Sequence, residues 1–264
     1  MSIGKEYSIG VVYFTSMAFV PPIKYLLTNG NAELAKSGIY TWSLPALSAQ
    51  VGGKMVQTCP NAGICANLCY ARSGTYRFSN VLAAHTVKLQ MLLDDLTGWQ
   101  ERITTELQAK RYRGGKTVRI HDSGDFFSRD YFQAWVDIAI STPDVFFYAY
   151  TKEVEMVKSF GPLPSNLVII FSMGGKQDKL VNKDIDRHAD VFPTLEALLD
   201  AGYTDQEEDD LLAATMPSNK VGIVVNNIPH LKKKQGIATF SSLQEERDER
   251  IAEIKTKTSP KETV

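Results

Sequence analysis

The chain has 264 residues, of which 44% are hydrophobic and 22% charged, and its formal net charge is -1. This length allows one domain with a substantial core, and the composition is typical of a soluble globular protein. With a net charge near zero, the protein as a whole is not strongly basic, so its overall charge gives no argument for nucleic-acid binding. A local basic patch is still compatible with this net charge. No apolar run approaches the ~18 residues of a membrane span, so we expect no membrane association.

The first apolar run, residues 9–20, predicts a buried strand or an arm packed on the core rather than a signal peptide. The next, residues 40–44, predicts a strand that enters a loop holding all three cysteines of the chain, Cys59, Cys65 and Cys69. An odd number of clustered cysteines does not fit a disulfide framework. It indicates a reducing compartment, and we expect a cytoplasmic protein whose thiolates bind a metal.

Strand and helix patterns alternate through the rest of the chain. Helices are predicted over residues 80–93, 98–110, 129–140, 194–201 and 205–214. Short, largely apolar strands are predicted over residues 117–120, 145–150, 167–171, 189–192 and 221–225. Strands of this kind are usually buried on both faces of a parallel sheet.

This alternation predicts a single α/β domain over residues 1–240. We expect a partial or full (β/α) barrel with the cysteine loop after its first strand, and an open doubly wound α/β sheet is the alternative. Residues 241–264 are highly charged and predict a solvated C-terminal helix and a frayed tail.

Polar residues follow the predicted strands at their carboxyl ends. They are His121, Asp122, Ser123, Gly124, Asp125, Lys152, Gly174, Gly175, Lys176 and Asn226. Because the carboxyl ends of parallel strands meet on one side of an α/β fold, we expect these residues to surround one mouth together with the cysteine loop.

The cysteine spacing is C-x5-C-x3-C. Thiolates are soft ligands that suit zinc and iron–sulfur centres. A structural zinc needs four ligands, so a histidine such as His85 or His121 would have to complete the site. Ordinary electron-transfer clusters use four cysteines, whereas three leave one iron of a four-iron–four-sulfur cluster free. We therefore predict such a cluster on Cys59, Cys65 and Cys69, with zinc as the alternative.

Radical S-adenosylmethionine enzymes also carry three cysteines in a loop after the first strand of a partial (β/α) barrel, usually spaced C-x3-C-x2-C. The wider spacing here does not meet that motif. The loop from Thr58-Cys59-Pro60 to Cys69-Tyr70-Ala71 resembles instead a phage family known as gene product 88. The resemblance extends over about residues 43–227 and includes the segments His121–Phe127, Phe147–Lys152 and Gly174–Asp178.

The resemblance implies a radical S-adenosylmethionine-like protein with one cluster and S-adenosylmethionine as cofactor. Asp122 or Asp125 would then pair with the cofactor ammonium, and Ser123 would bond its carboxylate. Gly124 would permit close backbone approach. The alternative for this segment is an Asx-type turn that caps the helix beginning at Arg129, with Ser128 as its N-cap.

The remaining candidates have weaker patterns. Lys152 is a candidate to face an anionic group, or is a solvated lysine. Gly174-Gly175-Lys176 resembles an anion-binding loop but lacks the full phosphate-loop pattern. Asn226 is a candidate to read an adenine edge, or forms a turn.

Two functional hypotheses follow. The first is a phage-associated enzyme in the host cytoplasm that uses an external electron donor and generates a radical on an unknown substrate, which is a nucleotide, a nucleic acid or a peptide. The second is a non-catalytic binding protein stabilised by zinc or an iron–sulfur cluster.

Overall fold

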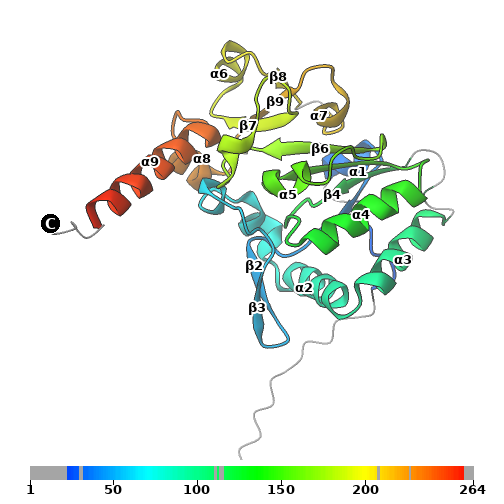
Figure 1. Cartoon of the computed structure of the whole chain (residues 1–264). Coiled ribbons are helices and arrows are strands. Elements are labelled where there is room, and N and C mark those ends of the chain that lie inside the picture. The colour runs from blue at the N-terminus through cyan, green and yellow to red at the C-terminus, as the bar shows by residue number, and fades with distance from the viewer. Residues whose placement is uncertain are drawn as a thin grey trace, which may run out of the picture.

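The computed structural model describes residues 23–29, 32–109, 112, 116–206, 209–225 and 227–258. Within these residues a seven-stranded sheet forms the centre of one α/β domain (Figure 1). In spatial order its strands are β1 (Ile39–Trp42), β4 (Thr117–Ile120), β5 (Phe146–Thr151), β6 (Leu167–Ser172), β7 (His188–Phe192), β9 (Lys220–Val224) and β8 (Thr204–Asp205). All neighbouring pairs are parallel, as the sequence predicted.

The helices lie between these strands and after them. They are α1 (Ala32–Lys36), α2 (Ser79–Asp94), α3 (Leu96–Leu107), α4 (Arg129–Ser141), α5 (Val154–Lys158), α6 (Leu195–Asp200), α7 (Leu212–Thr215), α8 (Pro229–Gln235) and α9 (Phe240–Thr258). A hairpin of β2 (Ser48–Val51) and β3 (Lys54–Gln57) lies between β1 and the cysteine loop. Short 3-10 turns follow as η1 (Ile64–Ala66), η2 (Tyr70–Arg72) and η3 (Gly74–Arg77), and η5 (Asp178–Leu180) follows β6.

The strands from β1 to β7 succeed one another in the sheet in chain order, and only β8 and β9 exchange places. A doubly wound sheet would reverse its strand order near the middle, and this sheet does not. In the part of the chain that the structure describes, β1 and β8 are the two edges and do not pair, so the sheet is open and a full barrel is not formed.

One face of the sheet carries a buried cluster that runs across its strands. Ile39 of β1, Tyr148 of β5 and Val221 of β9 belong to it. Leu34 of α1 and Ala213 of α7 belong to the same cluster, so these two helices cover that face.

The outer face packs against the longer helices. Trp42 of β1, Trp99 of α3 and Trp135 of α4 are buried, and the Trp99 ring lies 5.3 Å from that of Trp42 and 5.2 Å from that of Trp135. Aromatic contacts of this kind dominate the energetics of a core. They hold the helices α3 and α4 against this face of the sheet.

Most predicted elements are present within a few residues of their expected bounds, but the helix predicted over residues 205–214 is wrong. Thr204 and Asp205 pair with β9 as a short strand, and only Leu212–Thr215 is helical. Pairing with a neighbouring strand overrides a local helical pattern of this kind. The hairpin and the helices α5 and α8 were not predicted.

The apolar run at residues 9–20 and the candidate Asn226 lie outside the residues that the structure describes. None of the helices within the described ranges is both long enough and apolar enough to cross a membrane.

Candidate functional site

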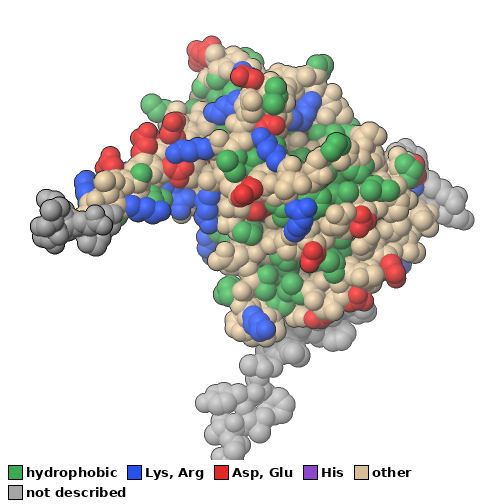
Figure 2. Space-filling view, viewed as in Figure 1, with side chains coloured by type: hydrophobic (Ala, Val, Ile, Leu, Met, Phe, Trp, Pro, Cys, Tyr) green, Lys and Arg blue, Asp and Glu red, His purple; other side chains and the backbone are tan. Residues whose placement is uncertain are grey.

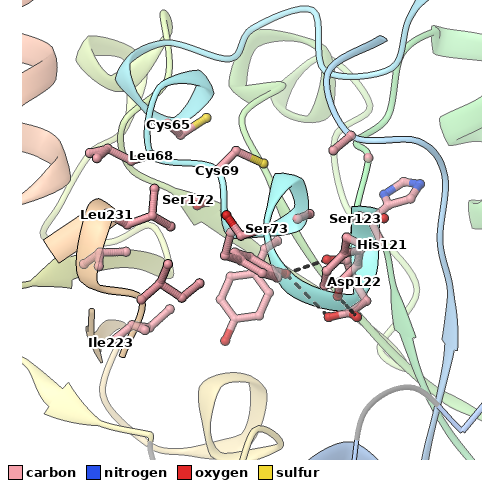
Figure 3. Close-up of a pocket in the computed structure, with 18 of the residues that line it drawn as sticks. Cys65, Leu68, Cys69, Ser73, His121, Asp122, Ser123, Ser172, Ile223 and Leu231 are labelled. Atoms are coloured by element: carbon pink, nitrogen blue, oxygen red, sulfur yellow. Dashed lines mark hydrogen bonds between the residues drawn. The ribbon is translucent and has the colours of Figure 1, made fainter. Parts of the chain in front are cut away.

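A cavity of about 1090 Å³ opens at the carboxyl ends of the parallel strands. Thr41 of β1, Asp122 after β4, Lys152 after β5, Ser172 of β6 and Ile223 of β9 all contribute to its wall (Figure 3). The cysteine loop and helix α8 complete it. The predicted residues His121–Asp125 and Lys152 therefore meet around one mouth, whereas Gly174, Gly175 and Lys176 do not line it. The mouth is at the position where α/β proteins bind ligands.

All three cysteines line this cavity as free, half-buried thiols. Burial raises the pKa of the Cys59 thiol, and the nearby Asp125 carboxylate raises it further. Burial also raises the pKa of the Cys69 thiol, with Cys65 as the next largest cause. The thiols thus face one space and influence one another. Figure 3 shows the sulfur atoms of Cys65 and Cys69 on the cavity side of the loop.

Across the described ranges, no group of three or more His, Cys, Asp or Glu side chains is placed to hold a single metal ion. His121, a candidate fourth ligand for zinc, is engaged elsewhere: its Nε2 lies 2.7 Å from the hydroxyl of Tyr131, and its ring packs on Phe126. Figure 3 shows this ring directed away from Cys65 and Cys69. Among the other candidate ligands, the three thiols and His85 line the cavity, and the described residues do not group them around one ion.

The cysteine loop is fastened to the loop that follows β6. The amides of Gly63 and Cys65 both donate to the carbonyl of Gly174 at 3.2 Å. The ammonium of Lys176 donates to the carbonyl of Pro60 at 2.7 Å. Lys176 therefore holds the cysteine loop in place, a role that its position in a glycine-rich segment did not indicate.

The Gly174 and Gly175 amides, predicted to receive a ligand anion, already bind a carboxylate of the chain itself. They donate to Oδ2 and Oδ1 of Asp178 at 2.7 and 2.8 Å. A Cβ atom on Gly175 would lie 3.0 Å from the side chain of Lys152 and 3.1 Å from the carbonyl of Asn61. The two glycines thus permit the close approach of two loops.

Helix α9 also supports the cysteine loop. Gln244, which is 1% exposed, accepts a hydrogen bond from the amide of Ile64 at 2.6 Å. A Cβ atom on Gly63 would lie 2.0 Å from the same Gln244 oxygen, so only glycine fits there. The first turns of α9 are therefore part of the site, although the sequence predicted a solvated helix.

The segment from His121 to Asp125 extends the contact between the ends of β1 and β4. Ser123 and Leu44 exchange hydrogen bonds: the Leu44 amide donates to the Ser123 carbonyl at 2.9 Å, and the Ser123 hydroxyl donates to the Leu44 carbonyl at 2.6 Å. Gly124 has a φ of 88°, and a Cβ there would lie 2.8 Å from that of Leu44. Ser123 and Gly124 thus have a structural role, because they hold the end of β4 against Leu44 after β1.

The two aspartates of this segment differ. Asp125 accepts hydrogen bonds from the Thr151 hydroxyl at 2.5 Å, the Lys152 amide at 3.0 Å and the Phe126 amide at 2.8 Å, so the chain itself satisfies its carboxylate. Asp122 lines the cavity and accepts a hydrogen bond from Tyr76. Of the two, Asp122 is the better placed to meet a ligand. The helix α4 is capped by Ser128, as predicted.

Lys152 is buried among the thiols. Its Nζ donates to the hydroxyl and carbonyl of Ser172 at 2.7 and 3.1 Å. Burial by itself lowers the pKa of Lys152, but Cys65 and the Asp125 and Asp178 carboxylates raise it, and the net shift is upward. A fixed positive charge therefore lies next to the cysteine loop, and Lys152 is not a solvated lysine.

A second polar group in the cavity was not identified from the sequence. The Arg119 guanidinium of β4 forms ion pairs with Asp210 at 3.0 Å and with Asp122 at 3.8 Å. It lies 5.0 Å from the ring centre of Tyr150, and Tyr148 donates a hydrogen bond to Asp210. Arg119 lies between the buried residues Val118 and Ile120 of β4, so its side chain points to the other face of the strand. That alternation was the available sequence signal. Its partner Asp210 lies 91 residues away and could not be identified from the sequence.

Comparison with known proteins identifies relatives among phages. A family model described as Gene product 88 matches residues 25–254. The Gene 88 protein of Mycobacterium phage L5 is 33% identical over 123 residues, and that of Mycobacterium phage D29 is 32% identical over 124 residues. Each alignment covers 44% of this chain and spans about half the length of the relative, 52% and 51% respectively. No solved structure matches.

Proposed function

The chain belongs to the Gene product 88 family, and we propose that it is an iron–sulfur protein that resembles radical S-adenosylmethionine enzymes. Cys59, Cys65 and Cys69 hold a four-iron–four-sulfur cluster in the proposal. The observation that carries it is that these three thiols, the complete cysteine content of the chain, line one cavity at the carboxyl ends of a parallel sheet.

The cysteine content supports a cluster over a single zinc ion. Thiolates suit both kinds of centre, but a structural zinc needs four ligands and the chain has three cysteines. A cluster distributes its cysteine ligands over several irons. Its fourth iron then has no cysteine to bind, because the chain has no further cysteine.

The strand order of the sheet supports a partial (β/α) barrel as the scaffold. Strands β1, β4, β5, β6 and β7 are neighbours in chain order, and all their pairings are parallel. With S-adenosylmethionine, a reduced cluster of this type supplies reductive cleavage of the cofactor and a radical for hydrogen abstraction from the substrate.

The residues of the chain have defined tasks in the proposal. Lys152 places a buried ammonium beside the thiolates and offsets their negative charge. Gln244 and the Gly174 carbonyl fix the cysteine loop through its backbone amides. Asp122, held by Tyr76 and Arg119, offers a carboxylate to the cofactor ammonium.

The test is anaerobic reconstitution of the full chain with iron and sulfide. We expect about four irons per chain, a broad visible absorbance band, and formation of 5′-deoxyadenosine after addition of dithionite and S-adenosylmethionine. Cys65→Ala should lose the band, whereas Gln133→Ala, on the exposed side of α4 and outside the cysteine loop, should retain it.

Metal analysis distinguishes the alternatives. One zinc per anaerobically purified chain, with no iron, would favour the zinc-stabilised binding protein. A stable cluster that forms no 5′-deoxyadenosine would favour the non-catalytic iron–sulfur protein. Absence of both metals after reconstitution contradicts the proposed centre.

A further inference from the structure

The acidic residues of the chain avoid two of its segments. None of the 30 Asp and Glu residues falls within residues 34–93 or 211–244, although nine of the 29 Lys and Arg residues do. The first segment contains the cysteine loop with η1 to η3, and the second contains β9 and α8. The net charge of -1 therefore conceals an uneven distribution.

These two segments meet at the mouth of the cavity. The Lys234 ammonium of α8 lies 3.4 Å from the carbonyl of Asn67, and Nε2 of His230 lies 3.3 Å from the hydroxyl of Ser73. Leu231 and Ser73 both line the cavity, on the walls that Figure 3 shows. Residues far apart in sequence thus form one rim.

The rim carries exposed positive charge. We define the basic rim as Arg72, Arg77, Lys232, Lys233 and Lys234, all of which are exposed. Figure 2 shows Lys and Arg side chains gathered around the place of α8 in Figure 1. Helix α9, which follows, carries both signs of charge, so the basic rim ends there.

An exposed aromatic ring adjoins the basic rim. Phe78 is 58% exposed and follows Arg77 directly, and Tyr76, two residues before it, lines the cavity. A positive surface that combines with exposed aromatic rings is the arrangement by which proteins bind single-stranded nucleic acids: the cations follow the phosphates and the rings stack on bases.

The interior of the cavity offers unpaired polar atoms. Among the described residues, Nε of Arg119, the hydroxyl of Tyr150 and Oε1 of Gln206 are buried without a hydrogen-bond partner, and all three residues line the cavity. Buried polar atoms are normally paired. The edge of a nucleobase carries both hydrogen-bond donors and acceptors, so it can pair with these three atoms.

We propose that the basic rim binds the backbone of a single-stranded nucleic acid, that Phe78 stacks on a base, and that one base enters the cavity toward Arg119 and Tyr150. Enzymes that modify a base in a strand must bring it out of the stack and into a pocket, and a volume of about 1090 Å³ accommodates a nucleobase. That the strand is a substrate rests on the proposed function, whereas the binding surface does not.

The test is fluorescence anisotropy of a fluorescein-labelled 20-nucleotide oligo(dT) with the full-length protein at several salt concentrations. We expect the affinity to fall with salt, because phosphate contacts release counterions. Lys232→Gln with Lys233→Gln should lower the affinity about tenfold and reduce the salt slope by about 0.7 per lysine. Lys255→Gln with Lys257→Gln, an equal charge change at the far end of α9, is the matched control and should have little effect.

Phe78→Ala tests stacking separately. It should weaken oligo(dT) binding about tenfold and leave an abasic strand of equal length unaffected. The proposal is overturned by absence of binding at low salt, by equal losses in the two lysine pairs, or by equally tight binding of polyglutamate or thymidine triphosphate. If the cluster fails to assemble but the protein binds oligo(dT), only the enzymatic proposal is contradicted. If the cluster assembles but the protein does not bind oligo(dT), only the proposed binding of a nucleic-acid strand is contradicted.

Discussion

The side-chain oxygen of Gln244 accepts a hydrogen bond from the backbone amide of Ile64 at 2.6 Å, across a sequence separation of 180 residues. Gln244 is buried in the first half of α9, and Ile64 opens η1 between Cys59 and Cys65. This contact joins the end of the chain to the proposed cluster loop and makes the position of the thiols dependent on α9.

Gln244→Ala should therefore leave the Ile64 amide without its acceptor and open a gap beside Gly63. We expect a loss of about 1–3 kcal/mol in the free energy of unfolding, measured by urea denaturation, and lower iron content after reconstitution. Gln133→Ala, an exposed glutamine on α4 that bonds only within its helix, is the control. Equal stability of the two variants would show that α9 does not support the loop.

The buried ion pair between Arg119 and Asp210 gives a second prediction. Asp210→Asn removes the closest carboxylate of a largely buried guanidinium, and the Asp122 carboxylate at 3.8 Å compensates only in part. We expect the free energy of unfolding to fall by about 2–3 kcal/mol. Asp144→Asn, which breaks an exposed pair with Lys116, should change stability little. A small effect at Asp210 would indicate that the pair is open to solvent.

His85 predicts a pH dependence of stability. Burial, followed by the nearby charge of Lys88, lowers the pKa of His85 to about 4, against an opposing effect of Asp122. Between about pH 6.5 and pH 4 the unfolded chain therefore binds a proton that the folded chain does not, and stability falls as the pH is lowered through this window.

His85→Gln should remove this contribution. We expect the difference in unfolding free energy between pH 7 and pH 4.5 to be smaller in the variant than in the native chain, measured by urea denaturation at both pH values. An unchanged difference would mean that His85 titrates as an exposed histidine does.

Lys152 provides a prediction on the proposed cluster. Lys152→Met keeps an unbranched side chain, shorter by one atom, but removes a positive charge beside the thiols. A more negative environment disfavours addition of an electron, so the midpoint potential of the reconstituted cluster should shift to more negative values in a redox titration followed by electron paramagnetic resonance. Lys158→Met, a more exposed lysine on α5, is the control. A shift of equal size in both variants would argue against a specific role of Lys152.

Local sequence features predicted much of the framework. Val118 and Ile120 are buried, and the strand predicted over residues 117–120 has those bounds in the structure. Ser128 caps α4 through a hydrogen bond from the Tyr131 amide at 3.3 Å, within one helical turn. Such features depend on neighbours in the chain, so the sequence contains the information directly.

The errors have the opposite origin. The residues 205–214 have a helical pattern, but Asp205 pairs with Gly222 of β9 and Asp210 pairs with Arg119 of β4. The Gly174 and Gly175 amides resemble an anion site, but Asp178 occupies them. In each case the competing partner is set by how the sheet and loops pack.

The amino-acid sequence alone shows three thiols in one loop, polar residues after apolar strands, and two segments without acidic residues. Tertiary packing brings the thiols and the strand ends to one cavity, places Lys152 and Gln244 against the cysteine loop, and joins the two acid-free segments into one rim. Residue identity and short-range periodicity are properties of the chain, whereas contacts such as that between Ile64 and Gln244 result from packing of the whole domain.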